Sequence, residues 1–181
     1  MRGVLNIKDT IQYNIPNAYI RISNYLKKYI DENTIIVCIG TDKFIGDCLG
    51  PLVGTYLKEQ KCPLPIYGTI ESPIHALNIH KELKKIDNLH PNSNSNILGV
   101  DASLGHGESI GTICIRNEPI YPGRGVGKVL PKVGRTSIVG IIDDSEDSTF
   151  FSNKSIRLHF VMEMAKVIAS SIMYSITIDK R

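Results

Sequence analysis

The sequence predicts an α/β protein, a three-layer sandwich in which helices cover both faces of a mostly parallel sheet. Short uninterrupted runs of Val, Ile and other apolar residues alternate along the chain with longer segments of helical apolar spacing. Uninterrupted apolar runs are typical of strands buried on both faces, and strands that alternate with helices form parallel sheets. Because 181 residues is the length of one domain, we expect a single α/β domain over residues 1–181, with residues 1–15 as an extended N-terminal segment.

The first part of the chain predicts a helix, a strand and a second helix. The first helix is expected over residues 16–32, where apolar residues recur at helical spacing and Asn14 or Asn17 can cap the start. The β-branched run 34–39 predicts a strand buried on both faces. Apolar residues on one face predict the second helix over residues 46–60.

The remaining elements continue this alternation. Further strands are expected over residues 65–70, 97–102, 111–116 and 137–142. The pair Ser72-Pro73 is typical of a helix start, with Ser as the cap, and predicts a helix that runs to Ile86. A long helix over residues 153–175 is expected to end the fold. The segment 119–134 is too rich in glycine and proline for a regular element.

Composition excludes several classes of partner. The 21 Lys and Arg residues against 18 Asp and Glu leave a formal charge of +3, too weak for us to expect nucleic-acid binding. We expect no membrane association, because the most apolar long segment, 156–178, contains His159, Glu163 and Lys166. The four cysteines lack zinc spacing, and the start lacks an export signal, so we expect reduced thiols and a cytoplasmic location.

Two aspartates stand where strands of the predicted sheet end. Asp47 follows the strand 34–39, and Asp101 ends the apolar run that begins at residue 97. Ligands of parallel sheets bind at the carboxyl ends of the strands, so the two carboxylates meet there if their strands are close. Close carboxylates can share a proton and act as general base and acid toward water, or they can hold a divalent cation. For Asp47 alone, the simpler interpretation is a charge at a helix start.

Further candidate residues follow the same strands. We expect Thr41 and Asp42 after the first strand, and Glu71 and His75 after the second, to contact substrate. A glycine loop supplies the other substrate-binding candidates, which are Gly123, Arg124, Gly125 and Gly127. Alternating glycines allow close backbone approach, so exposed N–H groups can cradle an anion or a substrate carbonyl, and Arg124 adds positive charge. The alternative for this segment is a surface loop without a binding role.

Three motifs in order resemble a known group of proteins. The run Gly46-Asp47-Cys48-Leu49-Gly50-Pro51 is similar to a segment that carries an active-site aspartate in spore germination proteases. Val100-Asp101-Ala102 resembles the strand that carries their second aspartate, and residues 122–127 resemble their proline-glycine loop. The chain most resembles the smaller YyaC-type sporulation proteins, which share its size and its Tyr67-Gly68-Thr69 and Pro73-Ile74-His75-Ala76 runs.

The resemblance implies a phosphorylase/hydrolase-like sandwich, shared with the hydrogenase maturation endopeptidases. It also implies a sporulation-associated hydrolase of the sporulating cell or spore interior, with peptidase as the expected activity, a peptide or protein substrate and no cofactor. In the maturation endopeptidases, residues at the positions of Asp47 and Asp101 bind nickel with a downstream histidine. Here no histidine occurs between His106 and His159. A metal-dependent maturation endopeptidase with Asp47 and Asp101 as ligands, a non-catalytic regulatory protein and a homo-oligomer remain alternatives.

Overall fold

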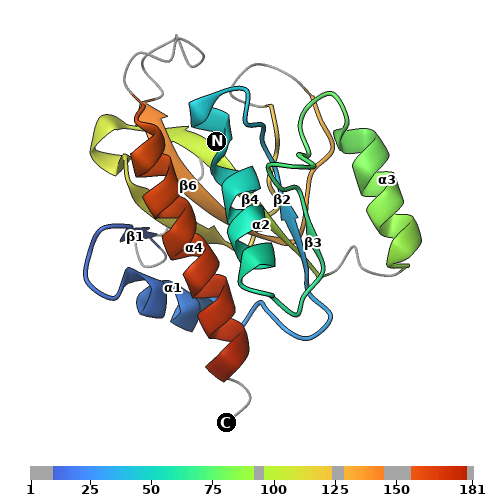
Figure 1. Cartoon of the computed structure of the whole chain (residues 1–181), viewed down its shortest axis with the longest axis horizontal. Coiled ribbons are helices and arrows are strands. Elements are labelled where there is room, and N and C mark those ends of the chain that lie inside the picture. Colours follow the sequence, from blue (N-terminus) through green and yellow to red (C-terminus); the bar gives the residue numbers. More distant parts are fainter. Residues whose placement is uncertain (1–9, 92–95, 124–128, 145–155, 179–181) are drawn as a thin grey trace.

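The fold is built on one six-stranded sheet with the strand order β1-β5-β6-β4-β2-β3 (Figure 1). The computed structural model describes residues 10–91, 96–123, 129–144 and 156–178. The strands are β1 (Thr10–Gln12), β2 (Ile35–Cys38), β3 (Ile66–Tyr67), β4 (Ile97–Gly105), β5 (Thr112–Arg116) and β6 (Thr136–Asp144). The helices of the described residues are α1 (Ala18–Leu26), α2 (Leu49–Glu59), α3 (Ile79–Leu89) and α4 (Leu158–Ile178), with short 3-10 turns η2 (Ile45–Asp47) and η4 (Gly107–Ser109).

The sheet is mixed, whereas the sequence predicted a mostly parallel one. β4 pairs in parallel with β2 and β6, and β2 pairs in parallel with β3. β5 is antiparallel to β6, and β1 is antiparallel to β5. The connection from β4 to β5 contains only the short turn η4, and a parallel crossover needs a dozen or more residues. β5 therefore runs back along β6, and the prediction of parallel strands holds for the β6-β4-β2-β3 part alone.

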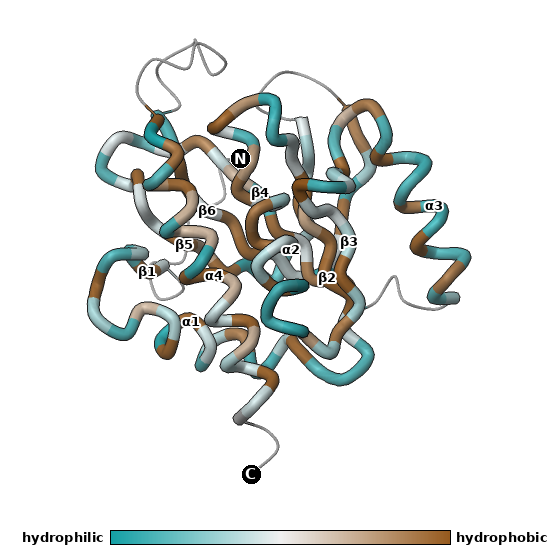
Figure 2. Tube along the Cα trace, in the orientation of Figure 1, coloured by the Kyte–Doolittle hydropathy of each residue, from teal (hydrophilic) through white to brown (hydrophobic). Residues whose placement is uncertain are grey.

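Helices lie on both faces of the sheet, and each face has its own apolar core. On one face, α1 and α2 pack against the long helix α4, and Ile22, Leu57 and Ile168 are fully buried there. On the other face, Ile79 and Ile86 of α3 are buried against residues of β2. Figure 2 shows the resulting pattern, with apolar residues along the central strands and a hydrophilic outer side of α3.

Helix α4 belongs to the protein core. By length and composition alone, Leu158–Thr177 is apolar enough to cross a membrane, which is weak evidence because core helices pass the same test. The buried residues Val161, Ala165 and Ile172 pack into the core cluster that also holds residues of α1 and α2. The fold is consistent with a soluble protein.

Several predicted boundaries are wrong, and two of them change the setting of candidate residues. β4 continues to Gly105 because β6 pairs with it along that whole length, so Asp101 lies inside a strand and not at its end. Helix α3 begins at Ile79 and not at Pro73, because the backbone before it pairs with the end of β2. The N-terminal strand β1 was not predicted, and residues 1–9 lie outside the described part of the chain.

Helices α1 and α4 are also shifted from their predicted ranges. α1 spans Ala18–Leu26, shorter than the predicted 16–32, and Asn17 at its N-cap position makes no capping side-chain hydrogen bond. α4 begins at Leu158, and residues 153–155 of the predicted range lie outside the described residues.

Candidate functional site

Asp47 is held at the end of β2 by a tight turn of the backbone. Gly40 has a φ of 136°, and a side chain there would overlap the carbonyl oxygen of Asp47. That carbonyl accepts a hydrogen bond of 2.9 Å from the backbone N–H of Thr41, and the N–H of Asp47 donates to the carbonyl of Phe44 at 2.9 Å. Asp47 is therefore the last residue of the turn η2. It lies two residues before Leu49, where α2 begins, so the interpretation of Asp47 as a charge within the helix start is corrected.

Small residues let helix α2 approach the strands closely and so fix the position of Asp47. A side chain at Gly50 would overlap the carbonyl oxygen of Ile39 and lie 2.8 Å from the Ile39 nitrogen. One helical turn later, a side chain at Gly54 would overlap the carbonyl oxygen of Gly68. Since Asp47 precedes α2 by two residues, this close helix–strand contact determines how far the aspartate stands from the sheet.

Asp101 lies in the middle of the sheet, on the strand next to β2. In β4, Val100 is the register partner of Cys38, and Asp101 is the partner of Val139 in β6. The sequence left open whether the two aspartate-bearing segments are close, and the pairing of β2 with β4 meets that condition. The backbone N–H of Ala102 donates a hydrogen bond of 2.8 Å to Oδ1 of Asp101.

Burial makes both carboxyl groups weaker acids than usual. Burial raises the pKa of Asp47 to about 6, and the backbone N–H of Thr41 opposes the change. Burial, and then the negative charge of Asp47, raise the pKa of Asp101 well above its usual range, with the Ala102 hydrogen bond opposing. The two groups therefore interact electrostatically, and both carboxyls hold a proton more readily than an exposed aspartate does.

Cysteines next to the pair are protonated thiols. Burial raises the pKa of Cys48 to about 11, and the nearby charges of Asp47 and Asp42 add to the effect. Burial, followed by the charge of Asp101, raises the pKa of Cys38 even further. A thiolate nucleophile is disfavoured at both positions. All four cysteines are free, and Cys38, Cys48 and Cys114 are buried.

The other predicted contact residues surround this edge of the sheet with different exposure. Thr41 is buried, and its Oγ1 accepts a hydrogen bond of 3.3 Å from the backbone N–H of Lys43. Asp42 and Glu71 are exposed. His75 lies four residues before α3, so its predicted position in a helical first turn is wrong.

Asn78, which the sequence analysis did not single out, organises the turn around His75. Its Oδ1 accepts a hydrogen bond of 2.8 Å from the backbone N–H of His75, and its Nδ2 donates to the carbonyl of Pro73 at 2.9 Å. Ile74, between them, forms a parallel bridge with Ile39, and its carbonyl accepts a 2.8 Å hydrogen bond from the N–H of Gly40. An Asn three residues after a Pro-Ile-His run is the signal that could have revealed this side-chain turn.

The described arms of the glycine-rich segment lie against the start of β4. Ile120 and Val133 form an antiparallel bridge with two 2.9 Å hydrogen bonds, and the Ile120 side chain covers Gly99. Gly134 lies against the carbonyl of Ile97, so the two arms run in the direction that leads to Asp101. Gly123, on one arm, has a φ of 76°, as expected for a glycine turn. Arg124, Gly125 and Gly127 lie outside the described residues.

The two side chains that could ligate a metal ion here are the carboxylates of Asp47 and Asp101. Among the described residues, no group of three or more His, Cys, Asp or Glu side chains lies close enough to hold a metal ion. Asp47 and Asp101 can supply oxygen ligands, which suit hard divalent cations.

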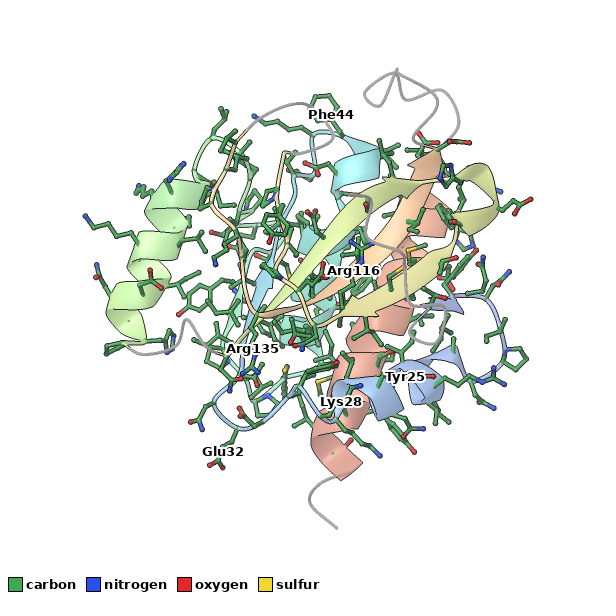
Figure 3. All side chains as sticks on the ribbon, turned by 180° about the vertical axis from the view of Figure 1, so that it is seen from behind. Tyr25, Lys28, Glu32, Phe44, Arg116 and Arg135 are labelled. Atoms are coloured by element: carbon green, nitrogen blue, oxygen red, sulfur yellow. The ribbon has the colours of Figure 1, made fainter. Side chains whose placement is uncertain are left out.

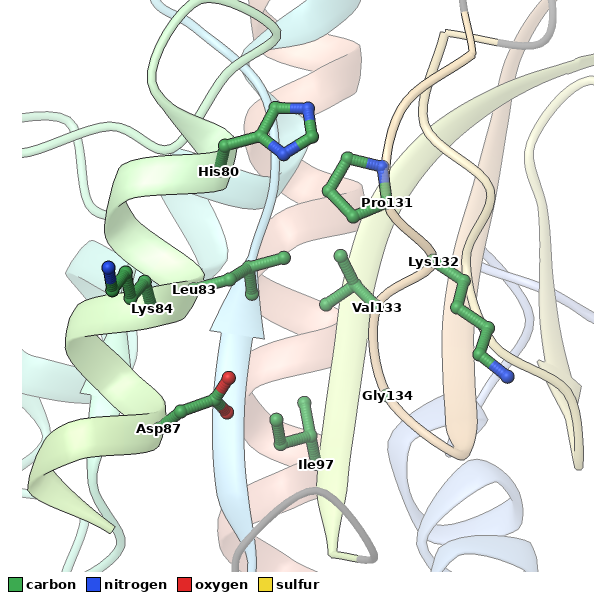
Figure 4. A pocket seen from close by; sticks show the side chains of 9 residues that line it. All are labelled: His80, Leu83, Lys84, Asp87, Ile97, Pro131, Lys132, Val133 and Gly134. Atoms are coloured by element: carbon green, nitrogen blue, oxygen red, sulfur yellow. The ribbon is translucent and has the colours of Figure 1, made fainter. Parts of the chain in front are cut away.

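A solvent-open cavity of about 270 Å³ lies elsewhere, between α3 and the segment 131–134 (Figure 4). His80, Leu83 and Asp87 of α3 face it from one side, with Pro131, Val133 and Ile97 opposite. The cavity lies on the α3 side of the sheet, and neither Asp47 nor Asp101 lines it. The aspartate pair and this cavity are separate features of the fold.

Comparison with known proteins places the chain in one family. Residues 10–171 match the family described as "Protein of unknown function (DUF1256)". The chain is similar to "Uncharacterized protein YyaC" of Bacillus subtilis (strain 168), with 41% identity over 152 residues that cover 83% of this chain and 73% of the relative. Asp47, Asp101 and the glycine-rich segment all fall within the matched residues. The chain therefore belongs to the DUF1256 family, with YyaC among its members.

Proposed function

We propose that the protein is a hydrolase that cleaves peptide bonds, with Asp47 and Asp101 as the groups that activate water. One observation carries the proposal: two carboxyl groups lie on neighbouring segments of the sheet, and burial raises the pKa of both while the charge of Asp47 adds to the rise at Asp101. We infer that the pair shares one proton, which Asp101 holds. Raised and unequal pKa values are typical of paired catalytic carboxyl groups.

The two protonation states suggest the division of roles. Ionised Asp47 takes a proton from water as the water oxygen bonds to the scissile carbonyl carbon. Protonated Asp101 gives its proton to the carbonyl oxygen as that bond forms. Breaking of the carbon–nitrogen bond then releases the amine, which leaves with the proton that Asp47 had taken, and the carbonyl re-forms as Asp101 regains its own. Backbone N–H groups of the glycine-rich segment would polarise the carbonyl.

The proposal extends to fold class and location. Helices on both faces of the sheet and parallel pairing of β3, β2, β4 and β6 support a three-layer, phosphorylase/hydrolase-like arrangement. Four free cysteines, at positions 38, 48, 62 and 114, support a cytoplasmic protein. A sporulating cell or spore interior is proposed from the resemblance of the aspartate motifs to the spore germination proteases.

The test is cleavage of unfolded protein by three purified variants. Asp47→Asn and Asp101→Asn are expected to reduce cleavage by at least a hundredfold, the usual scale for loss of a general acid or base. The matched control is Asp87→Asn, which changes an exposed aspartate of α3 away from the pair and should leave the rate within about twofold. Cleavage that survives both active-pair substitutions contradicts the proposal.

The same experiment separates the metal-dependent alternative. Cleavage that requires an added divalent cation, and is abolished by a chelator, would make Asp47 and Asp101 ligands of the metal and not a proton-sharing pair. Metal analysis of the purified protein gives an independent readout of the same alternative.

A further inference from the structure

The two most exposed large apolar side chains in the described residues are Val129 and Leu77. Their exposed fractions are 98% and 88%. Leu89, at the end of α3, is next at 57%. Single exposed apolar residues are ordinary on protein surfaces, so their significance depends on where they stand.

Leu77 stands on an ordered turn beside the end of β2. The turn is tied to β2 through the bridge between Ile74 and Ile39, and to itself through the side chain of Asn78. The backbone N–H of Leu77 donates to Nδ1 of His75 at 3.2 Å. The side chain of Leu77 is therefore held out to solvent by a hydrogen-bonded backbone.

Val129 stands at the start of the second arm of the glycine-rich segment. The arms run from the level of Ile97 past Gly99 toward Asp101, which places Val129 beyond Gly99 at the carboxyl end of the sheet. Phe44, with an exposed fraction of 37%, lies at the same end and precedes Asp47 by three residues (Figure 3). Leu77, Val129 and Phe44 therefore belong to three separate connections at the carboxyl end of the sheet, where Asp47 also lies.

The charged side chains that the structure describes at this end are mainly acidic. Asp42 and Glu71 are exposed, Asp143 is half-buried at the end of β6, and Lys43 is the exposed base beside them. An apolar side chain of a ligand would gain free energy by covering Leu77 or Val129. An acidic group next to it would be repelled by these carboxylates.

We propose that this end of the molecule binds an extended peptide segment that carries a large apolar side chain with no acidic residue beside it. The inference rests on the proposed peptidase function and names the class of segment that the enzyme would take. A peptide fits because its side chains can reach apolar contacts from several connections while its backbone passes the aspartates. Leu77 and Val129 are then specificity-determining residues that do not take part in the chemistry.

The test measures binding without turnover. Random dodecapeptides displayed on phage are selected on the Asp101→Asn protein, and a selected peptide is synthesised with a fluorescein label. Fluorescence anisotropy then gives its Kd for that protein and for the same protein carrying Leu77→Ser, Val129→Ser or, as the matched control, Leu89→Ser. All of these side chains are exposed, so every variant is expected to keep its melting temperature.

The expected result is enrichment of Leu, Ile or Phe without neighbouring Asp or Glu. Leu77→Ser and Val129→Ser should each weaken binding about tenfold, and Leu89→Ser should leave it unchanged. Selected peptides that are polar or acidic, or binding that is unaffected by Leu77→Ser and Val129→Ser, would overturn the inference. So would a dimer that Leu77→Ser converts to a monomer in sedimentation, because a second copy would then occupy the surface.

The outcomes also separate this inference from the proposed function. If the wild-type protein cleaves no peptide but the binding pattern is found, the peptidase proposal fails and the recognition surface stands. If Asp101-dependent cleavage is found and the apolar substitutions change neither Kd nor KM, the recognition surface alone fails.

Discussion

Replacing Asp47 by Asn is expected to stabilise the protein at neutral pH while it abolishes cleavage. Folding raises the pKa of this carboxyl from 3.8 to about 6 because burial disfavours its charged form. Each pKa unit corresponds to about 1.4 kcal/mol. At a pH above about 6, keeping Asp47 ionised in the folded protein therefore costs about 3 kcal/mol of stability. Partial exposure of the side chain and loss of its interaction with the Thr41 N–H reduce the gain, and we expect about 1–2 kcal/mol from the substitution.

The pH dependence follows from the direction of the change. Between pH 3.8 and about 6 the folded protein binds more protons at Asp47 than the unfolded chain does. The contribution of Asp47 to the free energy of unfolding is therefore largest below about pH 3.8 and falls as the pH rises to about 6. Urea unfolding of wild type and Asp47→Asn at about pH 7.5 should show the full difference, equivalent to roughly 3–8 °C in Tm. At about pH 3.5 the difference should nearly disappear, because Asp47 is protonated in the folded protein and mostly protonated in the unfolded chain.

The exposed neighbour Asp42 supplies the control. Asp42→Asn removes the same charge from the same connection, so an effect of net charge alone would appear in both variants. A stability gain confined to Asp47→Asn identifies burial as the cause. An Asp47→Asn protein that is less stable than wild type near neutral pH, or that differs from it equally at both pH values, would refute the reasoning.

Three further results are expected. Gly50→Ala should destabilise the protein by at least about 2 kcal/mol in urea unfolding, because the Cβ of Ala would overlap the Ile39 carbonyl. This is the opposite of the usual effect, since Ala normally favours a helix over Gly by about 1 kcal/mol. An unchanged midpoint of urea unfolding would contradict this close contact. Leu57→Ala should lower the free energy of unfolding by about 2–5 kcal/mol, because it opens a cavity in the core. Its control, Lys58→Ala on the solvent side of α2, should lower the free energy of unfolding by less than about 0.5 kcal/mol. Peptide cleavage should rise with pH as Asp47 ionises near pH 6 and fall at higher pH as Asp101 loses its proton; a flat profile would exclude the proposed roles.

Most element types could be predicted because each depends on local spacing. The buried strand β2 and the helices α1, α2 and α4 follow from runs and periods of apolar residues, and their errors lie at the ends. The strand β1 could not be predicted, since its three residues are extended because they pair with β5. The start of α3 was placed too early for the same kind of reason. Ser72-Pro73 has the local form of a helix start, but pairing of Ile74 with Ile39 keeps that segment extended.

The candidate site shows the same division between local and tertiary information. Residue types and apolar runs were enough to find two aspartates next to buried strands, and they left the closeness of those strands open. The pairing of β2 with β4, the place of Asp101 inside β4 and the close approach of α2 that sets the place of Asp47 all depend on tertiary contacts. The same contacts bury both carboxyls, which raises the pKa of each, and the charge of Asp47 adds to the rise at Asp101. The physical reason is that desolvation and repulsion between carboxyl groups depend on what surrounds each one, and residues far apart in the chain supply those surroundings.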